Sequence, residues 1–350
     1  MPMTGIAKRT LVAAACGLAM MLVAGAGAAP TQAGTQAMLP IKIGGFKGSL
    51  ISFPAEVAMK KGFFKQHGLD ASLLYFASCP DIFNVMLSGG IDSASCPLSL
   101  VMADNAKGFH LRLVTNNIAA QEYTLIARKG LSRPNRDKPY PQNLLDLKGK
   151  VIGVTVRGSD VENLMRFFLK KAGLDPDTDV TWLSVGGPPT AIAAFKAGRV
   201  DYMAAWEPEQ TVLVSIDKDA DVILDTRKGE GSPLFENYIS NMTEAQASAL
   251  AKSPEKFARL AAVWAETIAY MKDPSHFDEL VDIFSSTSGL GKPTIESMLK
   301  SNLRYFDSTI SCGSLNNVAK FEVDVGDITK DKIPSCKDLV WSGSHKYLAP

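Results

Sequence analysis

Two short stretches of the sequence, "VMLSGGIDSA" (85–94) and "AFKAGRVDYM" (194–203), follow the same plan. Each contains the end of a helix-like run, a glycine, an apolar residue followed by an aspartate, and the start of a strand-like run. The two aspartates, Asp92 and Asp201, are 109 residues apart. Such a repeat predicts that one structural unit occurs twice in the chain.

The stretches upstream of both aspartates extend the repeat. Ile43 and Ile152, each in a strand-like run that leads into glycine, are also 109 residues apart. A "GLD" sequence at 68–70 returns at 173–175 with a spacing of 105 residues, which indicates a four-residue shift within the unit. The strand-like runs are 41–46, 71–76 and 91–95 in the first unit, and 151–156, 179–185 and 200–205 in the second. Helix-like runs at 52–68, 79–90, 159–173 and 188–199 separate them.

The helix-like runs carry ordinary start signals. Residues 161–169 place apolar side chains at spacings of three and four, with Ser159 or Asp160 as the expected N-cap. Pro80 and Pro189 fall in the first turns of two other helices, where a missing backbone N–H is tolerated. The order βαβαβ, found twice, predicts an α/β fold of two lobes with parallel strands and right-handed crossovers.

Ligands of such sheets bind beyond the carboxyl ends of the parallel strands. We therefore expect a cleft between two facing strand edges, lined by six loops. These loops are 46–49, 78–79 and 95–97 in the first unit, and 157–159, 186–187 and 205–207 in the second. Asp92 and Asp201 open the third strands at the opposite edge, so we expect them to have structural roles.

The rest of the chain is expected to join and cover the lobes. Segments 124–129 and 222–227 are interpreted as two crossings that form a double hinge. The first lobe would then contain residues 40–128 and 228–350, and the second lobe residues 129–227. The last hundred residues have helical patterns and are expected to cover the first lobe. Thr243 and Ser253 are the predicted caps, the latter followed by Pro254.

The first 29 residues are typical of a cleaved secretory signal. Lys8 and Arg9 precede the apolar run Leu11–Val23, and small residues follow at 24–29. A transmembrane anchor is the alternative, but the run is shorter than the roughly 20 residues that span a bilayer. Cys16 is an unfavourable lipidation site because apolar residues continue after it. We expect export to the periplasm.

Composition and charge are those of an ordinary globular protein. The 350 residues include 46% apolar and 21% charged residues, enough for two domains or one large domain. The chain has 37 basic and 36 acidic residues, and loss of Lys8 and Arg9 with the signal would leave a net charge near −1. This balance gives no electrostatic reason to bind nucleic acid or an anionic membrane. We expect a monomer.

Four cysteines follow the signal: Cys79, Cys96, Cys312 and Cys336. An even number in an exported chain suggests disulfides, with three connectivities open. Pairing Cys79 with Cys96 and Cys312 with Cys336 closes the shortest loops. Alternatively, one or both pairs are free buried thiols. Their spacing does not fit a zinc site.

The sequence resembles the nitrate/taurine/sulfonate class of solute-binding proteins of ABC importers, the NMT1-like group. The resemblance lies in "IKIGGF" and "SFPAEVAMKKGFFKQHGLD", "LSGGIDSA", "LKGKVIGVTVRGS" and "AFKAGRVDYMAAWEP", in that order, and covers roughly residues 40–230. It implies a type II periplasmic binding fold that closes around a small solute, with a membrane permease and its ATPase as partners. In that class the six loops hold the ligand, so we transfer the role to those positions.

In the first unit, Phe46 is a candidate for stacking, and Gly48 and Ser49 are candidates for polar contacts; an ordinary glycine turn is the alternative. Ser78 and Cys79 end the second strand and Cys96 the third. If bonded, the two cysteines brace cleft loops; if free, they are candidates to touch the ligand.

In the second unit, Arg157, Gly158 and Ser159 open a helix whose free N–H groups favour an anion. Arg157 either adds charge or points to solvent. Trp206 either stacks on the ligand or packs under its loop. Glu207 would repel an anion, so it either binds an amino group or docks the permease.

The amides Asn116, Asn117 and Gln121 are weaker candidates near the hinge. Together these residues favour a small anionic or heterocyclic organic solute. The alternative is an enzyme like the thiamine-pyrimidine synthase, which shares this fold. Against it, the sequence has no clustered cysteines, phosphate loop or metal-ligand spacing, and His67 lies at the expected exposed end of a helix. We expect no catalytic residue, cofactor or metal. A sensor's ligand-binding domain is a third interpretation.

Overall fold

The structure is a computed structural model that describes residues 37–349. The predicted signal, residues 1–29, and Cys16 lie outside the described residues. Within residues 37–349, no helix has both the length and the apolar character needed to span a bilayer.

The first sheet has five strands in the order β2-β1-β3-β10-β4. Strand β1 (Leu39–Gly45) runs parallel to its neighbours β2 (Leu69–Tyr75) and β3 (Ser93–Pro97). Strand β10 (Asn241–Gln246) runs antiparallel to both β3 and β4 (Leu111–Ile118). Parallel pairing of the first three strands confirms the βαβαβ order of the first unit.

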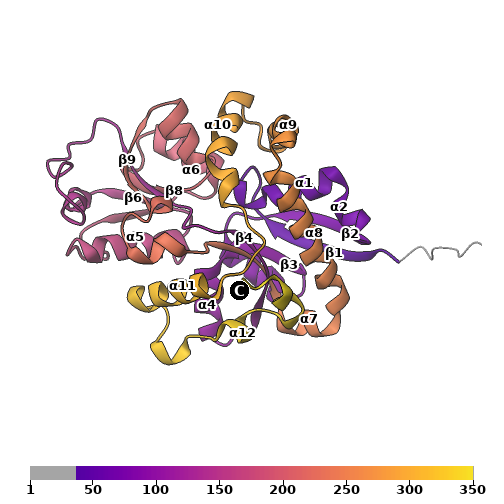
Figure 1. The fold of residues 1–350 in the computed structure, drawn as a ribbon. Helices are drawn as coiled ribbons and strands as arrows, with labels where there is room; N and C mark the ends of the chain where they lie inside the picture. The colour runs from indigo at the N-terminus through magenta and orange to yellow at the C-terminus, as the bar shows by residue number, and fades with distance from the viewer. Residues whose placement is uncertain (1–36, 350) are drawn as a thin grey trace, which may run out of the picture. The chain divides into compact units, whose positions relative to one another are not determined.

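The second sheet repeats this arrangement in the order β7-β6-β8-β5-β9. Strand β6 (Val151–Val154) runs parallel to β7 (Thr181–Ser184) and β8 (Tyr202–Ala205). Strand β5 (Thr124–Arg128) runs antiparallel to both β8 and β9 (Ala220–Asp225). The predicted duplication is therefore confirmed, and Figure 1 shows the two groups of strands with helices around them.

Besides the strand that follows its own unit, β4 or β9, each sheet contains one strand from elsewhere in the chain. β5 precedes the second unit in sequence and β10 follows it, yet each lies next to the third strand of its sheet. The chain thus passes between the sheets at 119–123 and 226–240. The prediction that 124–129 and 222–227 are the crossings was wrong, because both segments are largely strands that pair with each other. An apolar run such as "TLIA" does not reveal which sheet it joins.

The helices follow the predicted order with some differences. They are α1 (Phe53–Lys61), α2 (Phe63–Gln66), α3 (Cys79–Leu87), α4 (Leu98–Ala106), α5 (Asp160–Lys171), α6 (Pro188–Lys196), α7 (Ala247–Lys252), α8 (Pro254–Lys272), α9 (Phe277–Ser288), α10 (Lys292–Asn302), α11 (Cys312–Val325) and α12 (Cys336–Leu339). Ser159 caps α5 and Ser253 precedes α8, as predicted. The run at 52–68 is interrupted by Gly62, whose φ of 75° ends α1.

Thr243 does not cap a helix, because it lies in β10. The sequence of this strand, "NMTEAQ", does not alternate between apolar and polar residues. Five of its six residues are buried, so neither face of the strand is a solvent face that would require alternation. The C-terminal helices also do more than cover the first sheet. Helix α8 packs on α1, but α10 contacts the π-helical turn Thr211–Ile216 and α11 contacts α5, both next to the second sheet (Figure 1).

The repeated aspartates have matching structural roles. Asp92 Oδ2 accepts a hydrogen bond from Lys42 N at 2.8 Å, and Asp201 Oδ2 accepts one from Val151 N at 3.1 Å. Each carboxylate therefore ties the start of a third strand to the first strand of the same sheet. Each also has a cation, Lys256 for Asp92 and Arg128 for Asp201.

Both of the disulfides that close the shortest loops are present. Cys79 is bonded to Cys96, and Cys312 is bonded to Cys336. The first bond joins the start of α3 to β3, and the second joins α11 to α12. Because Cys79 and Cys96 are bonded and buried, the alternative of free thiols in this pair is excluded.

Candidate functional site

The loops beyond the parallel strands of the two sheets meet. The rings of Phe46, after β1, and Trp206, after β8, pack edge to face with centroids 5.4 Å apart. Leu50 N donates a hydrogen bond to the carbonyl oxygen of Glu207 at 3.4 Å. Both rings are buried, with exposed fractions of 3% and 5%. The two predicted edges therefore lie against each other in this structure.

Several predicted residues of the first edge form caps, a turn or a disulfide with neighbouring parts of the first sheet and its helices. Ser49 caps a short helical turn by accepting a hydrogen bond from Ile51 N at 3.3 Å. Gly48 has a φ of +66°, a conformation that favours glycine, and a side chain there would meet Ser288. Ser78 caps α3 by accepting from Asp81 N, and the Cys79–Cys96 bond follows it directly. The sequence prediction that these residues contact a solute stays a prediction.

The predicted residues of the second edge form a cluster at the start of α5. Arg157 Nε donates to Glu162 Oε2 at 2.9 Å, and Gly158 N donates to the same oxygen at 2.8 Å. Ser159 caps the helix by accepting from Glu162 N. Arg157 also lies over the Trp182 ring, 5.7 Å from its centroid. Its positive charge is paired within the protein and its side chain is about half exposed.

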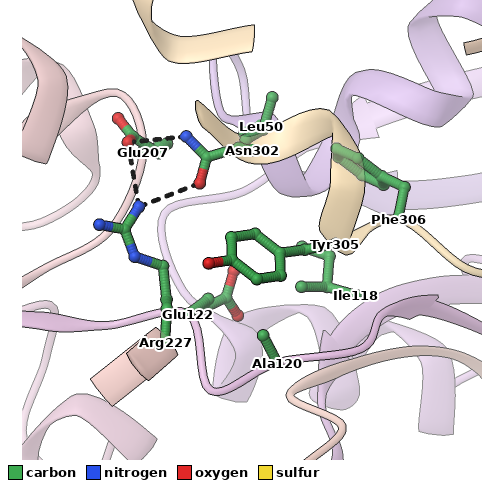
Figure 2. A pocket seen from close by; sticks show the side chains of 9 residues that line it. All are labelled: Leu50, Ile118, Ala120, Glu122, Glu207, Arg227, Asn302, Tyr305 and Phe306. Atoms are coloured by element: carbon green, nitrogen blue, oxygen red, sulfur yellow. Dashed lines mark hydrogen bonds and ion pairs between the residues drawn. The ribbon is translucent and has the colours of Figure 1, made fainter. Parts of the chain in front are cut away.

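A first cavity lies where the crossing segment 119–123 passes between the sheets (Figure 2). Its lining residues are Leu50, Ile118, Ala120, Glu122, Glu207, Arg227, Asn302, Tyr305 and Phe306. Of the predicted site residues, only Glu207 lines this cavity. Glu122 comes from the first crossing, Arg227 from the second, and Asn302 and Tyr305 from the end of α10 and the turn after it.

Three polar side chains of this first cavity bond to one another, whereas Glu122 Oε1 has no hydrogen-bond partner among the described residues. Asn302 Nδ2 donates to Glu207 Oε1 at 3.0 Å, and Arg227 Nη1 donates to Asn302 Oδ1 at 3.1 Å. Arg227 also holds Asp225 with two hydrogen bonds of 2.9 Å. Figure 2 shows the triangle of Glu207, Asn302 and Arg227 on one side of the Tyr305 ring. The guanidinium is therefore neutralised by its own carboxylate partners.

A second cavity lies on the other part of the same crossing. Its lining residues are Pro97, Ser99, Gln121, Tyr123, Asp160, Asn163, Leu164, Tyr238, Ser240, Phe321 and Glu322. They come from the end of β3 and the start of α4, both crossings, the start of α5, and α11. The Tyr123 hydroxyl donates a hydrogen bond to Asp160 Oδ2. This cavity thus collects residues associated with both sheets.

Carboxyl groups dominate both cavities. Burial, with help from nearby Asp160, raises the pKa of Glu122 to about 8. Burial raises the pKa of Asp160 to about 6, although the Tyr123 hydroxyl opposes the shift. Burial also raises the pKa of Glu207. Among the described residues that line the two cavities, Arg227 carries the only cationic side chain.

The hinge amides are divided between two places. Asn116 and Asn117 lie in β4 and bond to Thr309 O and Ser95 Oγ, so they belong to the first sheet. Gln121 lines the second cavity. The sequence prediction missed cavity residues of both crossings, such as Glu122 and Arg227, and also Asn302, Tyr305 and Glu322 from the C-terminal helices and the turn after α10. Nothing in their local sequence shows that α10 and α11 reach the junction of the two sheets.

Comparisons with known proteins agree with this fold. A family model described as the NMT1-like family matches residues 41–285. A protein of Bacillus subtilis (strain 168) that is named for binding aliphatic sulfonates is 26% identical over 333 residues, which covers 92% of this chain and 91% of the relative.

Two solved structures are also similar. The alkanesulfonate-binding protein SsuA from Xanthomonas axonopodis pv. citri, bound to MOPS, has a TM-score of 0.69 at 19% identity and covers 87% of this chain and 99% of its own. The nitrate-binding protein NrtA from Synechocystis PCC 6803 has a TM-score of 0.66 at 16% identity and covers 84% of each chain. The structural similarity, measured by these TM-scores, shows that the chain has the periplasmic binding protein fold.

Proposed function

Because this chain belongs to the NMT1-like family, we propose that it is an extracytoplasmic solute-binding protein that delivers a small organic solute to an ABC importer. Its partners would be a membrane permease and the associated ATPase, and it would act as a monomer in the periplasm. Relatives named for sulfonate and nitrate binding support the solute-binding role. The role is one of binding, with no chemical conversion of the solute.

The observation that carries this proposal is the meeting of two equivalent strand edges across a chain that crosses twice. Phe46 and Trp206 follow the first strand of one sheet and the third strand of the other, and their rings touch. A solute held there would contact residues associated with both sheets. Only a closed arrangement offers both sets of contacts, so solute binding favours closure by that difference in affinity.

Hinge closure would use the two crossings, 119–123 and 226–240. Few residues need to change their backbone angles when two rigid bodies move about such segments. Tyr123 and Glu122 in the first crossing, and Arg227 and Tyr238 in the second, also line the two cavities. Movement of the crossings would therefore change the shape of the site itself.

A ligand screen tests this function. Purified protein is heated with alkanesulfonates, nitrate, carboxylates, amines and aromatic heterocycles, and each solute is then examined by NMR after prolonged incubation. We expect one class to raise Tm in a concentration-dependent way. At a free solute concentration of a hundred times Kd, the free energy of unfolding should rise by about 3 kcal/mol. The solute is expected to remain chemically unchanged. Conversion of a solute to product, or the absence of any stabilising solute, would contradict the proposal.

A further inference from the structure

The second cavity is lined by buried carboxyl groups, and none of the described residues that line it carries a positive charge. Asp160 and Glu322 both line it, on α5 and α11. Glu322 has an exposed fraction of 0% and, although the Asp327 carboxyl lies close to it, neither of its carboxylate oxygens makes a hydrogen bond of ordinary geometry among the described residues. Tyr238 has an exposed fraction of 4%, and its hydroxyl likewise has no hydrogen-bond partner within residues 37–349. Buried polar groups normally find partners, so these groups favour a site for a polar ligand.

The surroundings of Glu322 make its charge costly. Asp160 and Asp327 are close enough to add like-charge repulsion. Asp327 accepts a hydrogen bond from Asn163, which occupies that amide. No Lys, Arg or His is among the described residues that line this cavity. A protein gains nothing in stability from such an arrangement, because buried carboxylates without cations are unfavourable.

An anionic solute would meet unfavourable electrostatics throughout this region. The start of α5 would ordinarily suit an anion, but the carboxyl of Asp160 lies there. The guanidinium groups of Arg157 and Arg227 are occupied by Glu162 and Asp225, respectively. The sequence expectation of an anionic solute therefore finds little support in the charges at the junction of the sheets.

We propose that the second cavity binds the protonated amine or amidine group of the transported solute, with Asp160 and Glu322 as its charged partners. This assignment rests on the proposed solute-binding function and specifies its solute class. Tyr123, Tyr238 and Phe321 supply aromatic walls, which favour an organic cation over a hydrated metal ion. Tyr238 and Phe321 pack edge to face with centroids 6.2 Å apart. The cation would give Glu322 and the Tyr238 hydroxyl the partners they lack.

Binding of defined probes tests the assignment. Putrescine and benzamidine serve as the cations, ethanesulfonate and benzoate as the matched anions, and calcium chloride as the metal. Each is titrated by calorimetry and by thermal shift into the unsubstituted protein and into Glu322→Gln, Asp160→Asn and Glu296→Gln. The last variant removes the same charge from the half-exposed face of α10 and is the control.

We expect putrescine or benzamidine to raise Tm in the unsubstituted protein and in Glu296→Gln. Glu322→Gln should weaken that binding about tenfold or more, as expected for loss of a charged hydrogen bond. Without solute, its Tm should change little, because burial and the nearby carboxyls raise the pKa of Glu322 well above its ordinary value, so the substitution removes little charge. Asp160→Asn provides the same test if Glu322→Gln does not fold.

Stabilisation by ethanesulfonate or benzoate that Glu322→Gln leaves unchanged would overturn the cation assignment and leave the solute-binding function intact. Calcium binding that depends on Glu322, or no effect of either cation, would also overturn the assignment. The function itself fails only if no solute class binds in the wider screen or if a solute is converted.

Discussion

Phe46 and Trp206 come from different sheets, yet their rings pack edge to face at 5.4 Å and both are buried. This contact joins the edge after β1 to the edge after β8. Trp206 also lies 6.3 Å from the Tyr123 ring, in the first crossing. The aromatic cluster therefore connects both sheets and one of the crossing segments.

The first prediction concerns this contact. Trp206→Ala should lower the free energy of unfolding by about 3 kcal/mol, because a large buried ring leaves a cavity. A double-mutant cycle with Phe46→Ala should give a coupling of about 1 kcal/mol for the edge-to-face pair. Urea unfolding followed by circular dichroism measures both values.

Trp182→Ala is the matched control for that cycle. Trp182 lies in β7, the edge strand of the second sheet, where its indole N–H bonds to Pro176 O, whereas the Phe46 ring packs on Trp206. Its coupling with Phe46→Ala should be close to zero. Equal couplings for the two tryptophans would mean that the Phe46–Trp206 contact carries no energy of its own.

The second prediction concerns Glu56, buried in α1 between Tyr75 and Thr287, whose hydroxyls bond to its carboxyl. Burial raises its pKa to about 7, although both hydroxyls and Lys47 oppose the shift. The folded state then binds more protons than the unfolded state between the two pKa values. Stability contributed by the protonated carboxyl should therefore be present below about pH 4.5 and lost as pH rises through about 7.

Glu56→Gln removes that titration. Relative to the unsubstituted protein, the variant should gain up to about 3 kcal/mol in unfolding free energy between pH 5 and pH 8. Urea unfolding at both pH values measures the change, and Glu296→Gln should show none. Parallel pH profiles for Glu56→Gln and the unsubstituted protein would contradict the raised pKa.

The third prediction separates the two disulfides by accessibility. Cys79 and Cys96 are buried, whereas Cys312 and Cys336 are partly exposed. A reductant should therefore open Cys312–Cys336 first, as mass spectrometry after alkylation would reveal. Replacing Cys79 and Cys96 together by alanine should lower the unfolding free energy by about 3 kcal/mol. Simultaneous opening of both bonds in folded protein would contradict the order.

The fourth prediction concerns protons at the second cavity. Burial and the nearby carboxyls of Asp327 and Asp160 raise the pKa of Glu322 well above its ordinary value. Tyr123 and Tyr238 face the same groups and remain uncharged at neutral pH because burial raises their pKa values as well. A bound amine favours ionised carboxylates, so binding at pH 7 should release about one proton.

Calorimetry with putrescine or benzamidine in phosphate and in Tris measures this release. The binding enthalpies should differ by the buffers' ionisation enthalpy multiplied by the protons released, and Glu322→Gln should reduce the difference. Identical enthalpies in the two buffers would show that no carboxyl changes its protonation when the cation binds.

The duplication could be predicted because its signals are local. Asp92 and Asp201 stand at the same place in each unit, and each ties a third strand to the first strand. The caps at Ser159 and Ser253 and the short-loop disulfides likewise depend on neighbouring residues or short spacings. Such features can be recognised from a short stretch of sequence.

The exchange of strands and the composition of the site could not be predicted in this way. β10 carries polar residues that are buried only because β3 and β4 flank it. Glu322 and Asn302 reach the site because α11 and α10 cross to elements beside the second sheet. These placements depend on packing between segments that are far apart in the sequence. The residues around Glu322 and Asn302 have an ordinary helical pattern, which does not show where in the fold the helix lies.

The most direct test of the central claim is a distance between the facing edges, measured by pulsed electron spin resonance. Spin labels at Lys47→Cys, in the loop after β1, and Ala193→Cys, on α6, report on the first and second edges at exposed positions. With the solute that gives the largest thermal shift, the distance distribution should become shorter and narrower than without it. The same distribution with and without that solute would contradict closure of two edges around the bound molecule.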